Sequence, residues 1–303
     1  MLTEMLQSYL AMRRAAGFAL RTTEKLLRQF VTFAMQQGDT HIISATVIAW
    51  ASQASSEPLR ANRLRMVSRF AQFAQAEDPT HELPATHIFR GHLQRRRPYL
   101  FSDEEVQRLL QYAGRLRPVG TLRPLAYQTL LGLLAVTGMR ISEVLALRFA
   151  DITSEGLVIA QTKFRKRRLV PLHPTAWSAL NRYLRVRQRV KTKDDHVFIS
   201  RRGTKFSYPT VAETFHALLE AAGIDGHPTS PRPRLHDFRH RFAVKALEAC
   251  PDSREHVARH MLALSTYLGH TRLESTYWYL ETTPQLMADI VSACETFRQG
   301  GKS

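Results

Sequence analysis

The chain has too little cysteine and too little continuous apolar sequence for several large classes of protein. Its 303 residues include only two cysteines, Cys250 and Cys294, which cannot make a disulfide scaffold and lack the spacing of a metal site. No apolar run approaches the roughly 18 residues that a membrane-spanning helix needs. Glu4, Arg13 and Arg14 place charges in the N-terminal segment, which does not resemble a secretory signal. We therefore expect a protein of a reducing cytoplasm without a membrane partner.

Acidic residues are also scarce. The chain has 26 Asp and Glu against 43 Lys and Arg, so that its formal net charge is +17 and its pI about 10.5. Its hydrophobic fraction of 44% is that of an ordinary folded protein, which excludes wholesale disorder. A folded chain with this excess of positive charge is expected to bind a polyanion, and nucleic acid is the first candidate.

Chain length and a change of sequence character near residue 90 predict two domains. At roughly 150 residues per domain, 303 residues suffice for two. Residues 1–88 have helical hydrophobic periodicity throughout, whereas residues 89–98 form a basic linker without sustained periodicity. The second domain, residues 99–303, opens with a capping box in which Ser102 precedes Glu105 by three positions.

The last predicted helix of the first domain, from about Pro58 to Ala76, has an apolar stripe on one face and arginines on the other. Only Glu57 lies close enough in sequence to balance them. This face is therefore either simply solvated or directed at phosphates of a nucleic acid. The candidate phosphate-binding residues are Arg60, Arg63, Arg65 and Arg69 on this helix and Arg95, Arg96 and Arg97 in the linker.

The second domain is predicted to be mainly helical with one small antiparallel sheet. Residues 156–160 and 168–172 are the two apolar runs that fit β-strands, with a polar, basic turn between them. Helices are expected at about 124–136 and again from Pro174 onward, and Thr210 with Glu213 predicts a second capping box. The sequence as a whole predicts a mainly α fold.

The turn between the two strands is the most strongly charged part of the chain. From residue 161 to 193 there are eleven basic residues and no acidic one. Charge runs are usually only solvated, but an uncompensated one at the tip of a hairpin favours contact with a polyanion backbone. The basic residues at this tip that we expect to approach DNA are Lys163, Arg165, Lys166 and Arg167.

Three further motifs hold the remaining candidate residues. In residues 137–143 a helix ends at a glycine, Arg140 begins the next helix, and Glu143 follows one turn later. An arginine held by a carboxylate in this way is oriented to bind a phosphate.

The second motif is residues 235–240. His236 and Arg239 lie on one helix face, while His236 and His240 have the spacing of a metal pair. Arg239 beside that pair would oppose a cation, so we prefer phosphate binding to metal binding.

The third motif is residues 268–279, which contain His270 and an aromatic cluster. Taken together, the three motifs and the hairpin lysine resemble the tyrosine recombinases, the phage-integrase and Xer-type family. The resemblance covers residues 99–283, and residues 1–88 are similar to that family's helical core-binding domain in size and position. The residues that carry it are, in order along the chain, Arg140, Lys163, His236, Arg239, His270 and Tyr279.

The family implies a mixed α/β catalytic domain and specific roles in it. Arg140 and Arg239 would hold the scissile phosphate of double-stranded DNA, His270 would donate a hydrogen bond to it, and Glu143 would support the site. No metal ion, cofactor or ATP is implied. The stretch between Arg239 and His270 is longer than is usual in the family. The sequence of residues 264–279 is similar to that of integrases of bacterial mobile elements. This resemblance implies action at the bacterial nucleoid.

Tyr279 would be the nucleophile that forms a 3′-phosphotyrosine link, because it stands nine residues after His270 as the family pattern places it. Tyr277 is the alternative. His236 would assist proton transfer from the nucleophile, and a lysine would protonate the departing 5′ oxygen. Lys163 has the expected position, but its neighbours are not the glycines common in the family, so Lys166 is a rival.

The resemblance also predicts partners. Family members act as tetramers on paired DNA sites, so a homo-oligomer or an assembly with related recombinases is expected. Residues 284–297 predict an amphipathic helix that would dock on a neighbouring protomer. Two other functions fit the same residues. One is a type IB topoisomerase, which shares the chemistry but exchanges no partners; the other is a non-catalytic DNA-binding accessory protein.

Overall fold

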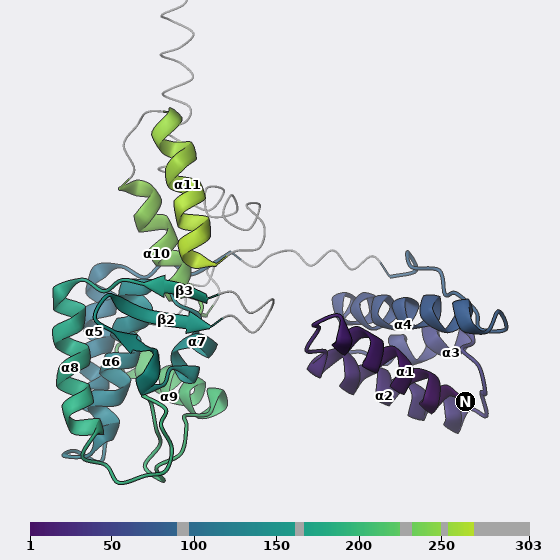
Figure 1. Ribbon diagram of the computed structural model, residues 1–303, viewed down its shortest axis with the longest axis horizontal. Coiled ribbons are helices and arrows are strands. Elements are labelled where there is room, and N and C mark those ends of the chain that lie inside the picture. Colours follow the sequence, from purple (N-terminus) through teal and green to yellow (C-terminus); the bar gives the residue numbers. More distant parts are fainter. Residues whose placement is uncertain (90–96, 161–166, 225–231, 250–253, 270–303) are drawn as a thin grey trace, which may run out of the picture. The chain divides into compact units, whose positions relative to one another are not determined.

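A computed structural model of the chain describes residues 1–89, 97–160, 167–224, 232–249 and 254–269 (Figure 1). The described residues up to 89 form one compact unit and those from 97 onward form another. In the described ranges no helix is both long enough and apolar enough to cross a membrane.

The first unit is a small helical bundle around one apolar core. Its side chains repeat at helical spacing, so that each helix has one apolar face, and Phe30, Trp50 and Phe70 fill the centre almost without exposure. The rings of Phe30 and Trp50 meet edge to face, with centroids 5.5 Å apart. The helices are α1 (Leu2–Ala15), α2 (Arg21–Gln36), α3 (Ser44–Ser52) and α4 (Glu57–Glu77).

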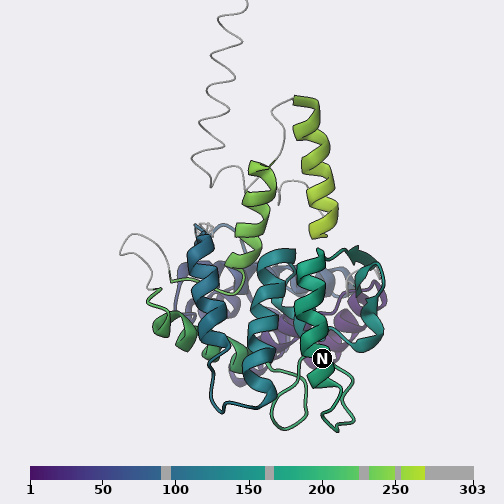
Figure 2. The ribbon, with the colours of Figure 1, turned by 90° about the vertical axis from the view of Figure 1, so that its left-hand side faces the viewer.

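The second unit is built around one central helix, α6 (Leu122–Thr137), which is buried on most of its circumference. Long helices on either side cover it, and both views of the ribbon show them as a layer (Figures 1 and 2). The other helices of this unit are α5 (Asp103–Ala113), α7 (Ile141–Ala146), the short 3-10 helix η1 (Phe149–Asp151), α8 (Pro174–Arg187), α9 (Tyr208–Ala221), α10 (Asp237–Glu248) and α11 (Arg254–Leu268).

A three-stranded antiparallel sheet lies beside this helical layer, in the order β1 (Ile152–Thr153), β2 (Gly156–Ala160) and β3 (Arg167–Val170). Val170 pairs with Leu157 and Arg168 with Ile159. Because side chains alternate along a strand, Arg168 and Val170 share one face, which is the buried one. An arginine therefore occupies an inward-facing position in β3.

Helices α10 and α11 form a pair that extends past the end of the main layer (Figure 1). Ala243 and Leu247 of α10 pack on Met261, Leu264 and Leu268 of α11 in a small core of their own. Two cations of α10 also tie this helix to the first turn of α5. Arg241 forms an ion pair with Asp103, and Lys245 binds the same carboxylate. The middle and the last turn of α10 are thereby fixed to the start of α5.

The predicted fold class, mainly α with a small antiparallel sheet, is confirmed. The capping box at Ser102 is also present, since its hydroxyl accepts the Glu105 amide at 3.2 Å and the Glu105 carboxylate accepts the Ser102 amide at 2.8 Å. The second predicted box is wrong. Ser207 caps α9, accepting the Thr210 amide at 3.3 Å, so the helix begins three residues earlier than Thr210 with Glu213 suggested.

Candidate phosphate-binding site

Arg140 and Arg239, the two arginines of the family pattern that the structure describes, both lie close to Gly138, the residue at which α6 ends. Arg239 lies in α10 and is 1% exposed. Its guanidinium donates one hydrogen bond to the Gly138 carbonyl at 2.9 Å and another to the Leu268 carbonyl at 2.7 Å. A planar group held by two fixed carbonyls cannot rotate freely, so Arg239 is oriented by backbone atoms of two other segments.

Gly138 makes the turn from which the site is built. Its φ is +60°, the left-handed region that ends helices and that other residues adopt with strain. A Cβ at this position would lie 2.6 Å from the Phe242 ring of α10, which is closer than packed carbon atoms approach. Glycine therefore allows α6 to end, α10 to pack against the turn, and the chain to arrive at Arg140 two residues later.

Arg140 directly precedes α7, and Glu143 in the first turn of that helix binds it twice. The Glu143 carboxylate accepts the Arg140 amide at 2.8 Å and its guanidinium at 2.9 Å. A second nitrogen of the Arg140 guanidinium donates to the Gly269 carbonyl at 3.2 Å. The Arg140 side chain is 36% exposed, so part of its hydrogen-bonding fork faces solvent and is available to an anion.

Sequence reasoning missed a third arginine in this cluster. Arg168 of β3 donates two hydrogen bonds to the same carboxylate, at 3.0 Å to Oε1 and 2.8 Å to Oε2 of Glu143. The two side chains are 9% and 11% exposed. The signal that could have found Arg168 is the alternation of β3, because an arginine at an inward-facing strand position needs a buried partner.

Glu143 stays ionised between these two arginines. Burial acts to raise its pKa, but the hydrogen bonds and charges of Arg168 and Arg140 outweigh burial and lower the pKa to about 2. The carboxylate is therefore charged at every pH at which the protein is expected to work. It neutralises one positive charge of the cluster and leaves the other for a ligand.

The C-terminal end of α11 lies against both Arg140 and Arg239. Arg239 binds the carbonyl of Leu268 and Arg140 binds that of Gly269. Cations are favourable at the C-terminus of a helix, where carbonyl groups lack partners within the helix. His270 is the next residue along the chain, and the structure does not describe it.

His236 directly precedes α10, and its ring packs on that of His240 with centroids 4.8 Å apart and an interplanar angle of 89°. Loss of solvent around the ring lowers its pKa, and the positive charges of Arg239, Arg234 and Arg140 lower it further, to about 4. The residue as a whole remains exposed to solvent. Near pH 7, His236 is thus a neutral imidazole that can accept a proton beside three cations.

Of the predicted site residues, Arg140, Glu143, His236 and Arg239 are brought together by α6, α7 and α10. Arg97 and Arg167 are described and exposed, the latter at the start of β3. Several other positions named from the sequence lie outside the described residues. They are Arg95, Arg96, Lys163, Arg165, Lys166, His270, Tyr277, Tyr279 and the predicted helix at 284–297.

In the first unit, the four arginines of α4 divide into two kinds. Arg60 and Arg63 are half-buried and donate to the carbonyls of Ala54, at 3.0 Å, and Trp50, at 3.1 Å, at the end of α3. Arg65 and Arg69 are exposed. The first pair therefore helps to join α3 to α4, whereas the second pair is available to a ligand.

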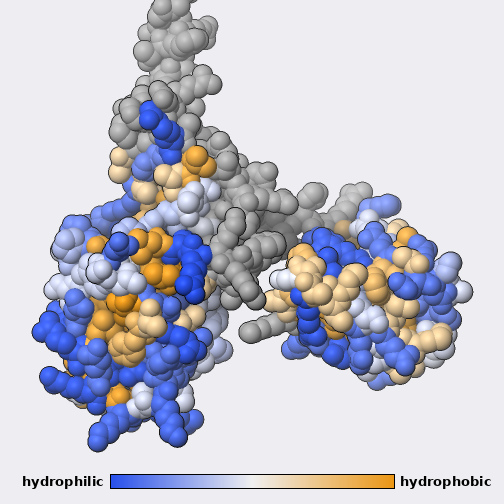
Figure 3. Space-filling view, in the orientation of Figure 1, coloured by the Kyte–Doolittle hydropathy of each residue, from blue (hydrophilic) through white to orange (hydrophobic). Residues whose placement is uncertain are grey.

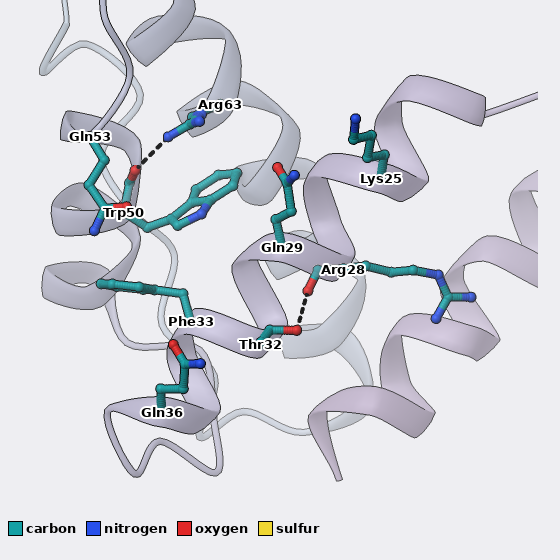
Figure 4. A pocket seen from close by; sticks show the side chains of 9 residues that line it. All are labelled: Lys25, Arg28, Gln29, Thr32, Phe33, Gln36, Trp50, Gln53 and Arg63. Carbon is teal, nitrogen blue, oxygen red and sulfur yellow. Dashed lines mark hydrogen bonds between the residues drawn. The ribbon is translucent and has the colours of Figure 1, made fainter.

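Next to Arg63 the surface of the first unit is hollowed between α2, α3 and α4 (Figure 4). The guanidinium of Arg63 lies over the Trp50 ring, 4.8 Å from its centroid. Amide and cationic side chains surround this pair, which are groups that donate to phosphates and to base edges. The hollow is lined by Lys25, Arg28, Gln29, Thr32, Phe33, Gln36, Trp50, Gln53 and Arg63.

The surface of the second unit is hydrophilic at the end where α8 finishes (Figure 3). The chain after α8 is rich in exposed cations that form no ion pair with a described carboxylate. These exposed residues are Arg189, Lys191, Lys193, Arg201, Arg202 and Lys205.

Comparison with known proteins identifies the family of this arrangement. The model of the phage integrase family matches residues 100–285. The chain belongs to the phage integrase family. This match includes the whole cluster around Arg140 and Arg239, and the predicted family is thereby confirmed. A tyrosine recombinase of this family is a site-specific DNA recombinase, an enzyme that cuts and rejoins DNA.

Curated relatives of this recombinase have matching names. It is similar to the putative integrase/recombinase y4rB of Sinorhizobium fredii, with 37% identity over 299 residues that cover 95% of each chain. It is also similar to the tyrosine recombinase XerD of Halalkalibacterium halodurans, with 30% identity over 242 residues, 78% of this chain and 75% of that one.

Solved structures of recombinases share the fold at low identity. XerH bound to a palindromic difH substrate matches with a TM-score of 0.68 and 18% identity over 91% of this chain and 80% of that one. A lambda integrase tetramer bound to a Holliday junction matches with a TM-score of 0.63 and 18% identity, covering 91% and 76%. These structural neighbours are recombinases bound to DNA, one of them as a tetramer.

Proposed function

We propose that this recombinase holds the scissile phosphate of double-stranded DNA between Arg140 and Arg239 and cuts the strand with Tyr279. The observation that carries the proposal is that both guanidiniums are fixed at the same helix end, through the carbonyls of Leu268 and Gly269. A phosphodiester gains negative charge on its non-bridging oxygens as it is attacked. Donors fixed in advance stabilise that state more than the ground state.

Proton transfer completes the proposed reaction. A phenol with a reference pKa of about 10 is a weak nucleophile until a base accepts its proton. His236 is neutral near pH 7 and lies next to Arg239, which suits it to assist this transfer. Tyr279 then bonds to phosphorus as a 3′-phosphotyrosine, and Lys163 or Lys166 donates a proton to the departing 5′ oxygen. The phosphate ester retains the bond energy, so rejoining requires no ATP.

DNA contacts outside the scissile phosphate are proposed for the first unit. Arg65 and Arg69 present free cations, and the hollow beside Arg63 presents amides and cations next to an aromatic ring. The linker arginines Arg95, Arg96 and Arg97, together with Arg165, Lys166 and Arg167 of the hairpin, would contribute further phosphate contacts. Assembly as a tetramer on two DNA sites, as a homo-oligomer or with related recombinases, completes the proposal.

A nicked suicide substrate made from the ends of the protein's own element tests the proposal. After cleavage the short fragment beyond the nick diffuses away, so that a covalent protein–DNA adduct accumulates. We expect an adduct that maps to Tyr279 by mass spectrometry, and we expect Tyr279→Phe to form none. Tyr277→Phe is the matched control, because it removes the same hydroxyl two residues away, and it should form the adduct.

The same substrate distinguishes the alternatives. Absence of an adduct from the wild-type protein, with specific DNA binding retained, would support a non-catalytic accessory protein. An adduct without exchange of strands between two labelled sites would favour topoisomerase-like chemistry. An adduct at Tyr277 would transfer the nucleophile to that residue.

A further inference from the structure

We infer that Arg168 is a positioning residue for the recombination reaction. It acts through Glu143, neutralising that carboxylate so that the positive charge of Arg140 remains available to the scissile phosphate. This inference rests on the proposed phosphate-binding role of Arg140 and adds a residue outside the family pattern on which that role was based.

The geometry makes Glu143 a bridge between two arginines. Its Oε1 accepts from Arg140 at 2.9 Å and from Arg168 at 3.0 Å, and its Oε2 accepts from Arg168 at 2.8 Å and from the Arg140 amide at 2.8 Å. The contact of Arg168 is bidentate, and that of the Arg140 guanidinium is single. Arg168 therefore binds the carboxylate more completely than Arg140 does.

Burial of Arg168 shows that this partnership is its main contact. The side chain is 9% exposed, and its Nε is buried without a hydrogen-bond partner among the described residues. Both terminal nitrogens of Arg168 donate to Glu143, so its guanidinium is committed to that carboxylate. Its charge is used inside the protein, whereas Arg140 is 36% exposed and can meet a ligand.

Counting charges shows what the arrangement achieves. With Arg168 present, the cluster of Arg140, Glu143 and Arg168 has a net charge of +1, and Arg239 adds a second positive charge. Without Arg168, Arg140 and Glu143 would form a neutral pair, and one positive charge near the phosphate would be cancelled. In a partly buried site solvent screens charges little, so this cancellation would markedly weaken the electrostatic attraction between the site and the phosphate.

Arg168 also joins the hairpin of β2 and β3 to Glu143 and, through it, to Arg140. It lies in β3, two residues after the segment 161–166 that contains the candidate proton donors Lys163 and Lys166. Through Glu143, it ties this strand to the first turn of α7. Tyr267 of α11 packs over the same region, and burial raises the pKa of its phenol to about 12 although Arg168 and Arg239 act to lower it.

The test measures the rate of covalent cleavage of the suicide substrate at saturating DNA, which separates the reaction from binding. We expect Arg168→Gln to slow cleavage by about 10- to 100-fold, because one stabilising charge is removed from the transition state, with little change in DNA affinity. Arg168→Lys keeps the charge without the planar fork and should fall between the wild type and Arg168→Gln. Arg148→Gln is the matched control, since it removes an arginine from an exposed ion pair with Asp195 in the same unit.

A rescue experiment distinguishes positioning from a purely structural role. If Arg168 serves to neutralise Glu143, then Glu143→Gln added to Arg168→Gln should restore part of the cleavage rate. A structural role predicts the opposite, with the double variant slower than either single variant and less stable to heat. Unchanged cleavage in Arg168→Gln, or a double variant slower than Arg168→Gln, would overturn the inference.

These results are separable from a failure of the proposed function. If the wild-type protein forms no adduct at Tyr279, the proposed function itself is wrong. If the wild type forms the adduct and Arg168→Gln forms it equally fast, only the role of Arg168 is wrong.

Discussion

The two units of this recombinase use arginine in different ways. In the second unit Arg140, Arg168 and Arg239 are held by a carboxylate or by backbone carbonyls at fixed distances, and two of the three are buried. In the first unit Arg65 and Arg69 are exposed on α4, and no described carboxylate pairs with them. The same side chain is positioned by geometry in one unit and left free in solvent in the other.

This contrast indicates two different demands on positive charge. Stabilising one phosphate during a reaction depends on where each donor points, so an error of an ångström matters. Holding the DNA backbone depends mainly on how many phosphates are neutralised, so mobile side chains suffice. Substitutions in the second unit should therefore affect the rate on bound DNA, and those in the first should affect affinity and its dependence on salt.

The largest effect is expected from Arg239→Lys. A lysine keeps the charge but cannot reproduce the two hydrogen bonds to Gly138 and Leu268 while also binding a phosphate. We expect the cleavage rate at saturating DNA to fall by about 10²–10³-fold, the usual cost of removing one oriented donor. Single-turnover cleavage measures this rate. A decrease of less than twofold would show that charge, and not orientation, matters at this position.

The next largest effect concerns the turn at Gly138, between α6 and Arg140. Gly138→Ala puts a side chain into left-handed backbone and within 2.6 Å of Phe242. We expect the free energy of unfolding to fall by about 2–4 kcal/mol, from backbone strain and overpacking together. Urea denaturation of the variant measures it. Gly132→Ala in the same helix is the control, because its nearest neighbour, Leu110, lies at 3.9 Å and an alanine fits there.

A smaller effect, of a different kind, is expected in the first unit. Replacing both Arg65 and Arg69 by Gln should leave the cleavage rate at saturating DNA unchanged. The dependence of log affinity on log salt should become shallower by about 0.9 for each phosphate that the protein no longer neutralises. Binding titrations at several salt concentrations measure the slope. Arg14→Gln, whose charge already pairs with Glu24, is the control and should change the slope less.

The smallest effect concerns protonation of the His236 ring at acidic pH, which should leave activity near neutral pH unchanged. The pKa of His236, about 4, lies below the value of about 6.5 for a free histidine, so the folded state favours the neutral ring. Stability linked to this group is complete above pH 6.5 and is lost as the pH falls toward 4. NMR of the imidazole, assigned with His236→Asn, should give a midpoint near 4. Adding DNA to the Tyr279→Phe variant should raise the midpoint, because a phosphate beside the ring favours its charged form.

Much of this arrangement was predictable from the sequence because it is local. The helical periodicity, the Ser102 capping box and the placement of Arg140 before Glu143 depend on residues within a few positions of one another. Helix boundaries were less certain where two capping residues competed, as at Ser207 and Thr210. The roles of Arg60 and Arg63 in joining α3 to α4 depend on tertiary contacts that their spacing did not reveal.

Arg168 shows why the rest was not predictable. Its sequence context is a run of basic residues, which suggested a surface for DNA. Only the strand register turns its side chain inward, and only the packing of β3 against α7 brings it to Glu143, 25 positions earlier in the chain. A contact at that separation leaves no periodic signal in the sequence.

The contacts of Arg140 and Arg239 with Gly269 and Leu268 fasten the end of α11 to the turn after α6, where Arg239 also binds the Gly138 carbonyl. The number of residues between Arg239 and Leu268 should then have little influence on where Gly269 lies, because extra length is accommodated before the chain is fastened. By the same reasoning, insertions before residue 254 should be tolerated, while a single residue added after Gly269 should put the downstream segment out of register with the phosphate.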